Sequence, residues 1–545
     1  MQKRKRPAKE KQQKIWKKKD QTGIYSSRLK RARVLPFQQA SLLQSLPDDV
    51  LYYLARTFLW EPTDIFDLAR TSRSLWGILE REIYITDVFA VQYHVSRGLE
   101  APRTTLLHWA ALAGRTDILS KALAAAKLVW TGYMNFQHSK CGHAAIHFAA
   151  HYGRLEVVRA LQREKEEGRA SSVDMTAASG WMCPAPQRLQ SILQRLTPGQ
   201  FRVPPEYMLQ DEDFPFKIDA LGLAILKGHR DVAMHLLDIY DAERIEEEKI
   251  FPPLHLAAFV GMAEVVESIL SRGINVSAVC KHVANSVAIH WAAAGSSKDE
   301  NTQTLRILRE YGADITIRDS VGRTPLDWAI GFKNADNVLY LLKRSIRSLA
   351  PGHLANQVEE WTKRLQRCMA DDLLLDCTKF ILKHCPRLPE ECLKLCVQST
   401  FWDIDRSWDE AGCVSTSSKN LATKRWLVDK NIGLGVLSKG ARQSWMQEEL
   451  FQGRCFLHYA AGSTDIDAEL LALAIQKRPH DIDVVDAKGL TPLELALGYR
   501  CIPEKVKLLL RSGANPALCY GGERARADVD RQIEQLTLEE EGDVE

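Results

Sequence analysis

The sequence lacks an apolar segment that could cross a membrane. No run of about 18 or more apolar residues occurs in the chain, although a spanning helix needs about 20. The N-terminal residues also lack the apolar core of a secretory signal peptide. The 12 cysteines are scattered through Leu-rich sequence, which is typical of reduced thiols. We therefore expect a soluble, intracellular protein of the nucleus or the cytoplasm, with no membrane partner.

Sequence motifs of catalysis are also absent. There is no phosphate-binding loop with Gly-Lys-Ser/Thr, and the Gly433–Gly435 turn lacks the third glycine of a dinucleotide fingerprint. Cys141 and His143 place a thiol near an imidazole, but they precede a predicted helix, where loop tips are polar and variable. We assign no catalytic residue, expect neither an enzyme nor a cofactor, and keep a divergent enzyme domain in residues 350–450 as an alternative.

One cysteine cluster resembles part of a metal site. It consists of Cys377, Cys385, Cys392 and Cys396, with His384 beside them. Cys392 and Cys396 could supply half of a zinc site, but no second close cysteine pair completes it. The spacing favours thiols in helix cores, and we assign no metal site.

Positive charge is concentrated at one end of the chain. Residues 1–33 contain 14 Lys and Arg against Glu10 and Asp20, so the remainder of this net +4 chain is acidic. We expect a disordered basic tail over residues 1–40, since segregated charge is typical of tails, and an acidic tail over residues 521–545. Nucleic acid would bind only through the basic tail. The tail contains basic clusters like those of nuclear-import signals, which predicts nuclear import. The alternative is a solvated tail without a role. The residues of these clusters are Lys3, Arg4, Lys5, Arg6, Lys17, Lys18, Lys19, Lys30, Arg31 and Arg33.

A short pattern recurs along the chain. It consists of an apolar residue, a second position that is often histidine, another apolar residue, an alanine and a small residue. Most copies are about 33 to 39 residues apart, the spacing of a helical repeat. The second position marks each of eight copies: His108, His147, Gly222, His255, His290, Asp327, His458 and Glu494. Because the histidines fall in different repeats, we expect them to form structural hydrogen bonds rather than one metal or catalytic site.

The pattern resembles the ankyrin repeat and its Thr-Pro-Leu-His-x-Ala-Ala opening. The opening is nearly complete at Thr324–Leu326 and Thr491–Leu493, although Asp327 and Glu494 replace the histidine. Paired alanines let two helices approach closely, and a glycine can end the first helix in a left-handed turn. Such glycines follow six residues after the marker at Gly114, Gly153, Gly228 and Gly261. The resemblance implies an all-α fold, an ankyrin-repeat solenoid of helix pairs with short β-hairpin loops.

The spacing of the markers predicts the extent of the repeats. We expect ankyrin repeats over residues 85–345 and 451–520, with degenerate helical repeats or an insertion over residues 346–450. The interval from His147 to Gly222 leaves room for one degenerate repeat, and the interval from Asp327 to His458 leaves room for three.

A different helical pattern precedes the repeats. Leu46-Pro47-Asp48-Asp49 is a strong helix start, because proline is tolerated in the first turn and carboxylates favour the positive end of the helix dipole. Two more short helices are predicted to start near Pro62 and Ser72. Together with the stretch Leu68–Trp76, these features resemble an F-box, which predicts a three-helix F-box-like domain over residues 41–84. The alternative is a helical cap that covers the first repeat.

These resemblances imply a non-catalytic adaptor. An F-box would hold a Skp-family adaptor and its cullin complex, and the docking residues are expected to be Leu46, Pro47, Leu51, Leu54 and Leu68. An ankyrin stack would hold an unknown target protein through the two residues before each marker glycine, with exposed aromatics as anchors: Leu112, His151, Tyr152, Phe259 and Val260. The expected function is therefore a substrate-recruiting subunit of a cullin-type ubiquitin ligase. The alternative is an ankyrin scaffold, possibly nuclear, without a ubiquitin-ligase role.

Overall fold

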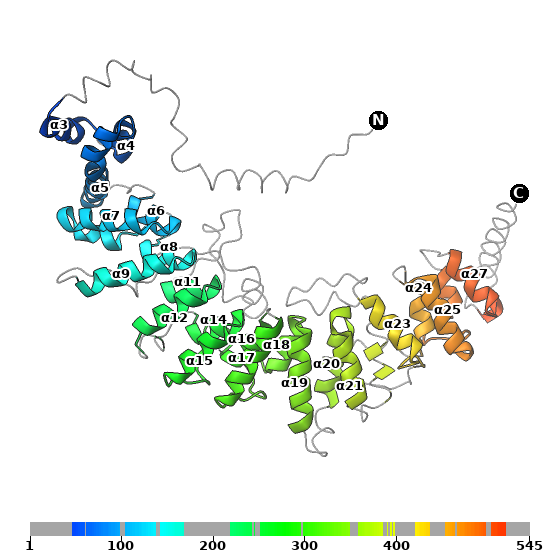
Figure 1. Cartoon of the computed structure of the whole chain (residues 1–545). Helices are drawn as coiled ribbons and strands as arrows, with labels where there is room; N and C mark the ends of the chain where they lie inside the picture. The colour runs from blue at the N-terminus through cyan, green and yellow to red at the C-terminus, as the bar shows by residue number, and fades with distance from the viewer. Residues whose placement is uncertain are drawn as a thin grey trace, which may run out of the picture. The chain divides into compact units, whose positions relative to one another are not determined.

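The fold is a succession of short helices, seen in a computed structural model of the chain (Figure 1). The structure describes residues 46–59, 61–98, 104–137, 142–167, 218–241, 245, 251–295, 298–348, 358–384, 390, 393–394, 396–397, 420–436, 453–463, 466–497 and 503–518. The chain divides into two units, one formed by Met1–Ala110 with Asp117–Phe136 and the other by Ala111–Thr116 with Gln137–Glu545.

The first unit begins with the three expected helices: α3 (Asp48–Phe58), α4 (Pro62–Ala69) and α5 (Arg73–Ser96). Asp48 and Asp49 lie in the first turn of α3, where they oppose the positive end of the helix dipole. Pro62 begins α4, and the Ser72 side chain caps α5 by accepting a hydrogen bond from the Ser74 backbone N–H at 3.2 Å. Each helix therefore starts where the sequence predicts.

The core of these three helices is formed by buried aliphatic residues from all of them. Its members are Leu51, Ala55, Ile65, Ala69, Leu75, Leu79 and Ile83. A salt bridge joins α3 to α5, because the Arg56 guanidinium donates to both carboxylate oxygens of the buried Glu82 at 2.8 Å. Such bidentate pairing fixes the orientation of the two helices as well as adding stability.

The third helix continues past the expected domain boundary at residue 84. Helix α5 contacts the 3-10 helix η1 (Thr131–Asn135) and the start of α6 (Leu106–Ala113), and the salt bridge of Glu80 with Lys121 joins it to α7 (Thr116–Val129). Buried Asp87 accepts hydrogen bonds from the Leu106 backbone N–H at 2.9 Å and from the Tyr133 hydroxyl. Residues 85–96 therefore belong to α5 rather than to a repeat.

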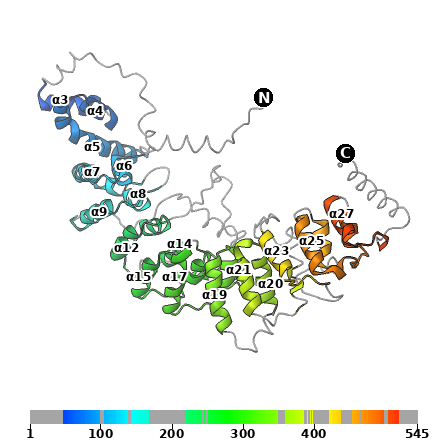
Figure 2. The same cartoon turned by 45° about the vertical axis from the view of Figure 1, so that its right-hand side comes forward.

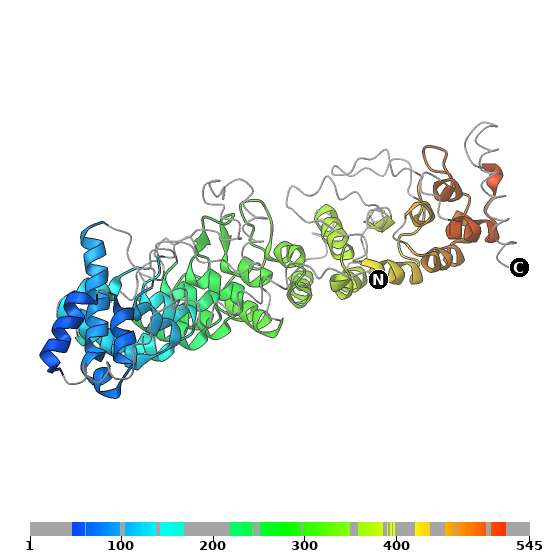
Figure 3. The same ribbon diagram turned by 90° about the horizontal axis from the view of Figure 1, so that it is seen from above.

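The second unit is a stack of helix pairs. Its elements are α8 (Ala145–His151), α9 (Leu155–Glu167), α11 (Ala220–Leu226), α12 (Arg230–Ile239), α14 (Pro253–Val260), α15 (Ala263–Ser271), β1 (Val279–Cys280), β2 (Ser286–Val287), α16 (Ala288–Ala294), α17 (Lys298–Glu310), α18 (Pro325–Gly331), α19 (Ala335–Ser348), α20 (Val358–Met369), η4 (Asp372–Leu374), α21 (Leu375–His384), α23 (Leu421–Asp429), α24 (Phe456–Gly462), α25 (Ala468–Lys477), η8 (Pro479–Asp481), α26 (Pro492–Leu497), α27 (Pro503–Arg511) and η9 (Pro516–Leu518). First helices pack on first helices and second helices on second helices, for example α14 on α16 and α15 on α17. Figures 2 and 3 show the same succession from two other sides. The expected all-α solenoid is confirmed.

The marker glycines end their helices as expected. Gly114, Gly153, Gly228 and Gly261 all have positive φ angles, between 67° and 88°. Gly261 is the C-cap of α14, and its backbone N–H donates to the Ala257 carbonyl. This left-handed conformation is easily reached by glycine and allows the chain to turn into the second helix of the pair.

The helix pairs before and after residues 168–217 pack on one another. Helix α8 packs against α11, and α9 packs against α12. The His229 ring nitrogen Nε2 also lies 2.9 Å from the His151 carbonyl, which links the two pairs. The degenerate repeat expected in this interval falls on residues that lie outside the described ranges.

Loops between pairs are tight turns held by a carboxylate. Strands β1 and β2 form an antiparallel hairpin in which Val279 is opposite Val287. In the next loop, Asp319 accepts hydrogen bonds from the backbone N–H groups of Val321 and Arg323 at 3.0 and 2.8 Å, and Gly322 there has a φ of 83°. The expected short hairpin loops are therefore present in this part of the stack.

The region between residues 346 and 450 continues the stack where it is described. Helix α20 packs on α18, and α21 packs on α19. Farther along, the Asp372 carboxylate of η4 accepts from the backbone N–H groups of Ala422 and Thr423 at the start of α23. The described part thus contains one complete helix pair and one further helix.

Candidate protein-binding surfaces

The repeated histidines link successive turns of the fold. In four of the five marker histidines, the imidazole nitrogen Nε2 lies 3.0 to 3.3 Å from a backbone carbonyl farther along the chain: His108 with Phe136, His255 with Ser286, His290 with Arg323, and His458 with Leu490. Burial lowers the pKa of His255 to about 4, so the ring is neutral at physiological pH. The structural interpretation of these histidines is confirmed.

Asp327 makes a different link at the same repeat position. Its carboxylate accepts from the Thr324 backbone N–H at 2.9 Å and from the Arg364 Nε of α20 at 2.9 Å. Both side chains are buried, with 10% and 7% exposed. Burial raises the pKa of Asp327, but the hydrogen bonds and charge of Arg364 outweigh it and hold the value at about 2. An ion pair therefore replaces the histidine bridge between these two repeats.

A buried thiol and imidazole lie close together in α24. The Cys455 Sγ is 3.2 Å from the His458 Nδ1, and the Cys455 backbone N–H donates to the same nitrogen. Burial raises the pKa of the Cys455 thiol to about 12, so the thiolate needed for nucleophilic attack is not formed. The pair closes the start of the helix, and the thiol is protonated at neutral pH.

The predicted cysteine cluster is only partly described. Cys377 and Cys396 are buried in helices, whereas Cys385 and Cys392 lie outside the described residues. Within the described ranges, no group of three or more His, Cys, Asp or Glu side chains could hold a metal ion. The described helices also include none that is long and apolar enough to span a membrane.

The residues predicted to bind the target differ in exposure. Tyr152 is 45% exposed, and Leu112, His151 and Val260 are half-buried. Phe259 is only 5% exposed, with its ring centroid 6.1 Å from that of Trp291. The expectation of an exposed aromatic at Phe259 is therefore wrong, because the neighbouring repeat covers its ring.

The five predicted docking residues of α3 and α4 are mostly part of the core. Leu51 is 2% exposed, and Leu46 and Leu68 are partly buried against the same core. Leu54 is half-buried, and Pro47 is exposed. Leu51 contributes to the fold of this segment and presents no surface to a partner.

An aromatic surface lies on the same helices and was not predicted from the sequence. Of 17 exposed large hydrophobic side chains in the described part of the chain, eight lie between residues 50 and 95. Val50 and Tyr53 lie one turn apart on α3, while the rings of Phe66 and Trp76 meet edge to face at 5.7 Å between α4 and α5. We call these four residues the aromatic surface. The sequence signal that could have revealed this surface is the high density of aromatic residues in this short helical segment.

The tails lie outside the described residues. The import clusters at residues 3–6, 17–19 and 30–33, and the acidic residues 521–545, are therefore known only from the sequence.

Comparison with known proteins supports the repeat assignment for part of the chain. Residues 254–349 match the family model "Ankyrin repeats (3 copies)", which corresponds to the pairs α14–α15, α16–α17 and α18–α19. No curated protein matches the chain. Ankyrin repeats indicate that the chain binds a protein partner.

Solved structures similar to the chain include two with low overall superposition. One is the ankyrin repeat domain of human ASB11, at 18% identity and a TM-score of 0.30, with 48% of this chain and 96% of that chain covered. Another is a chain in the structure of the predatory endopeptidase Bd0816 from Bdellovibrio bacteriovorus in complex with the immunity protein Bd3460. Its identity is 19% and its TM-score 0.29, with 45% of this chain and 100% of that chain covered.

Proposed function

We propose that the chain is a substrate-recruiting subunit of a cullin-type ubiquitin ligase. In this proposal, the helices of residues 46–96 dock a Skp-family adaptor, and the ankyrin stack holds a target protein. The observation that carries the proposal is the concentration of five exposed large hydrophobic side chains between residues 50 and 76. Exposed apolar clusters on proteins in water are typical of sites that a partner covers.

The local sequence supports the same interpretation. The Leu-Pro start of α3 and the Thr-Ser-Arg stretch before α5 are the discriminating parts of the F-box pattern. In the structure, Ser72 of that stretch caps α5, and Leu51 lies in the core. We therefore infer that the aliphatic residues of the pattern build the fold, whereas the aromatic surface docks the adaptor.

The proposal is tested by calorimetric titration of the full chain with a purified Skp-family adaptor. The variant Tyr53→Ser/Phe66→Ser should bind about 100-fold more weakly, because truncating central aromatic anchors costs about 2 kcal/mol or more. The matched control is Phe89→Ser/Tyr93→Ser, which removes two exposed aromatics from the far half of α5. It should bind like the wild type. If the wild-type chain does not bind the adaptor, the ankyrin scaffold without a ligase role remains.

The target surface is proposed on the stack at Leu112, His151, Tyr152 and Val260. Tyr152→Ala should weaken target capture at an unchanged melting temperature, because its ring is exposed. Phe259→Ala should lower the melting temperature, because its ring is packed in the core. Equal target capture by wild type and Tyr152→Ala would reject this surface.

Nuclear import is proposed for the basic clusters of residues 3–33. Deleting residues 1–33 should lower the nuclear fraction of a fluorescently tagged chain. An unchanged nuclear fraction would reject the import signal.

A further inference from the structure

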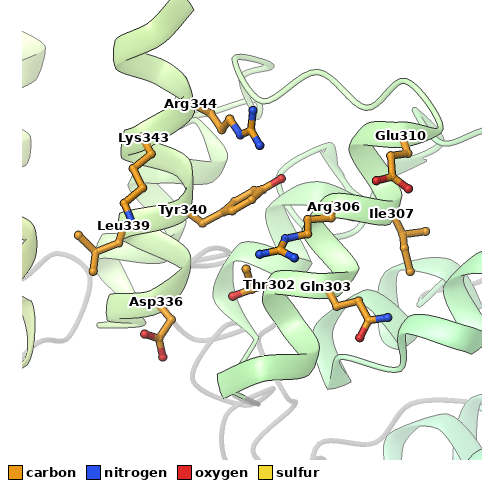
Figure 4. Close-up of a pocket in the computed structure, with 10 residues that line it drawn as sticks. All are labelled: Thr302, Gln303, Arg306, Ile307, Glu310, Asp336, Leu339, Tyr340, Lys343 and Arg344. Carbon is orange, nitrogen blue, oxygen red and sulfur yellow. The ribbon is translucent and has the colours of Figure 1, made fainter.

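A groove lies between the second helices of two neighbouring repeats, α17 and α19 (Figure 4). Its volume is about 840 Å³. The charged and aromatic residues that line it are Arg306 and Glu310 from α17, and Asp336, Tyr340, Lys343 and Arg344 from α19. It is formed by second helices, whereas the proposed target residues of the stack lie at the ends of first helices.

The basic side chains of the groove form no ion pair with the described residues, unlike many other basic side chains of the stack. Within the described ranges, Arg306 and Lys343 form no ion pair or hydrogen bond, and Arg344 contacts only the Tyr340 ring, with its guanidinium carbon 5.8 Å from the ring centroid. Comparable basic residues nearby are paired, as in the salt bridge of Arg318 with Glu360 at 3.0 Å. The groove therefore presents three basic side chains that no carboxylate of the described chain pairs with.

Tyr340 adds a hydrogen-bonding group at the centre of this charge. Its hydroxyl oxygen is covered and has no hydrogen-bond partner among the described residues. Leaving a buried polar group unpaired costs about 1 to 3 kcal/mol, so the position of the Tyr340 ring is not held by its hydroxyl. Figure 4 shows the Tyr340 ring and the Arg306 guanidinium extending toward one another from opposite walls.

The two acidic residues limit what can bind. Asp336 lies at the start of α19, and Glu310 is the last residue of α17, so carboxylates flank the basic centre. A continuous phosphate backbone would meet repulsion at both of them, which disfavours nucleic acid. A short run of carboxylates in a peptide can pair with the basic centre without reaching them.

We propose that this groove binds a short acidic segment of a partner protein. Carboxylates of the segment pair with Arg306, Lys343 and Arg344. The partner uses a surface other than the target surface, so the stack can hold two proteins at once.

The test uses photocrosslinking of the full chain with a hexaglutamate peptide that carries a benzophenone group, followed by mass-spectrometric mapping. Crosslinks are expected on α17 and α19. Lys343→Glu should lower them about tenfold, since it replaces an attractive charge pair with a repulsive one. Lys383→Glu makes the same charge change at an exposed position of α21 and should leave them unchanged. Crosslinks to residues 1–33 serve as an internal reference for non-specific binding.

Several results would overturn the proposal. One is equal loss of groove crosslinks in the two variants, and another is equal crosslinking by a hexaglutamine peptide. A third is a gain of about tenfold in groove crosslinking when the chain is truncated after Leu518. That gain would identify the chain's own acidic residues 521–545 as the occupant instead of a partner.

Discussion

The helical segment of residues 46–96 and the repeats of residues 253–348 use aromatic side chains in opposite ways. In the repeats, Trp291 and Trp328 are at most 2% exposed, and their ring centroids lie 6.5 Å apart across the boundary between two pairs. In the helical segment, Tyr53 and Phe58 are about two-thirds exposed, at 64% and 65%. The repeats thus use aromatics to bind their neighbours within the chain, and the helical segment leaves them open to a partner.

The difference has a physical origin. A repeat cannot cover its own apolar face, so the adjacent repeat covers it and the aromatics become core. The three helices of residues 46–96 already form a core from aliphatic residues such as Leu51 and Ile65. Their aromatics are therefore not needed for folding, which favours a binding role for them.

The sharpest comparison is the same substitution in both regions. Trp291→Ala should lower the free energy of unfolding by about 3 to 5 kcal/mol, because it leaves a cavity lined by Phe251, Phe259 and Trp328. Trp76→Ala should cost about 1 kcal/mol or less, since the side chain is 36% exposed. Chemical denaturation of both variants measures the two values. Similar losses would show that the regions do not differ in this way.

Breaking the ion pair between α18 and α20 should have a slightly smaller effect. Arg364→Leu leaves the buried Asp327 carboxylate without its cation and should cost about 3 kcal/mol. The double variant Asp327→Leu/Arg364→Leu should recover most of this loss, because neither charge is then buried alone. A double-mutant cycle by denaturation measures the coupling. Additive losses would contradict a direct pair.

Substitution of the aromatic surface should affect binding without affecting stability. Tyr53→Ser/Phe66→Ser should lose about 2.7 kcal/mol of adaptor binding, equivalent to about 100-fold in affinity. Its melting temperature should stay within a few degrees of that of the wild type, because both rings are exposed. Differential scanning calorimetry measures this, and a large drop would identify the rings as core.

Asp87 should make the stability of the first unit depend on pH. Burial raises the pKa of Asp87 to about 6, although hydrogen bonds from Tyr133 and the Leu106 backbone oppose the shift. The folded state then holds the proton more tightly than the unfolded state, so the contribution of Asp87 to stability falls as pH rises from about 4 to about 6, by about 3 kcal/mol. Asp87→Asn should remove this pH dependence, which denaturation at several pH values can measure. An unchanged pH profile in the variant would contradict the assignment.

The repeats could be predicted where they carry their marker, and less well elsewhere. The recurring pattern predicted the pairs from α14 to α19, and the marker glycine Gly261 predicted the turn after α14. The pair α20–α21 carries no marker, because Trp361 and Arg364 fill the corresponding helix. Asp327 was a sequence signal that could have revealed this pair. A carboxylate that replaces the buried histidine of the repeat requires a cation, and the next repeat supplies it.

The helical segment shows a different limit of sequence reasoning. Its helix starts were predicted from Pro47, Pro62 and Ser72, because these residues act locally. Leu51 and Leu54 were both predicted to face a partner, but the structure buries Leu51 in the core and leaves Leu54 half-buried. Neighbouring apolar stripes on a helix are equivalent in sequence, and only the position of α5 decides which one is covered.

Hydrogen exchange of the full chain, measured with and without a purified Skp-family adaptor, tests the central claim most directly. The account predicts that the adaptor slows exchange in α3 and α4 and in the first half of α5, whereas exchange in the repeats of residues 253–348 is unchanged. Slowed exchange in the repeats alone, or no change anywhere in the chain, would contradict it.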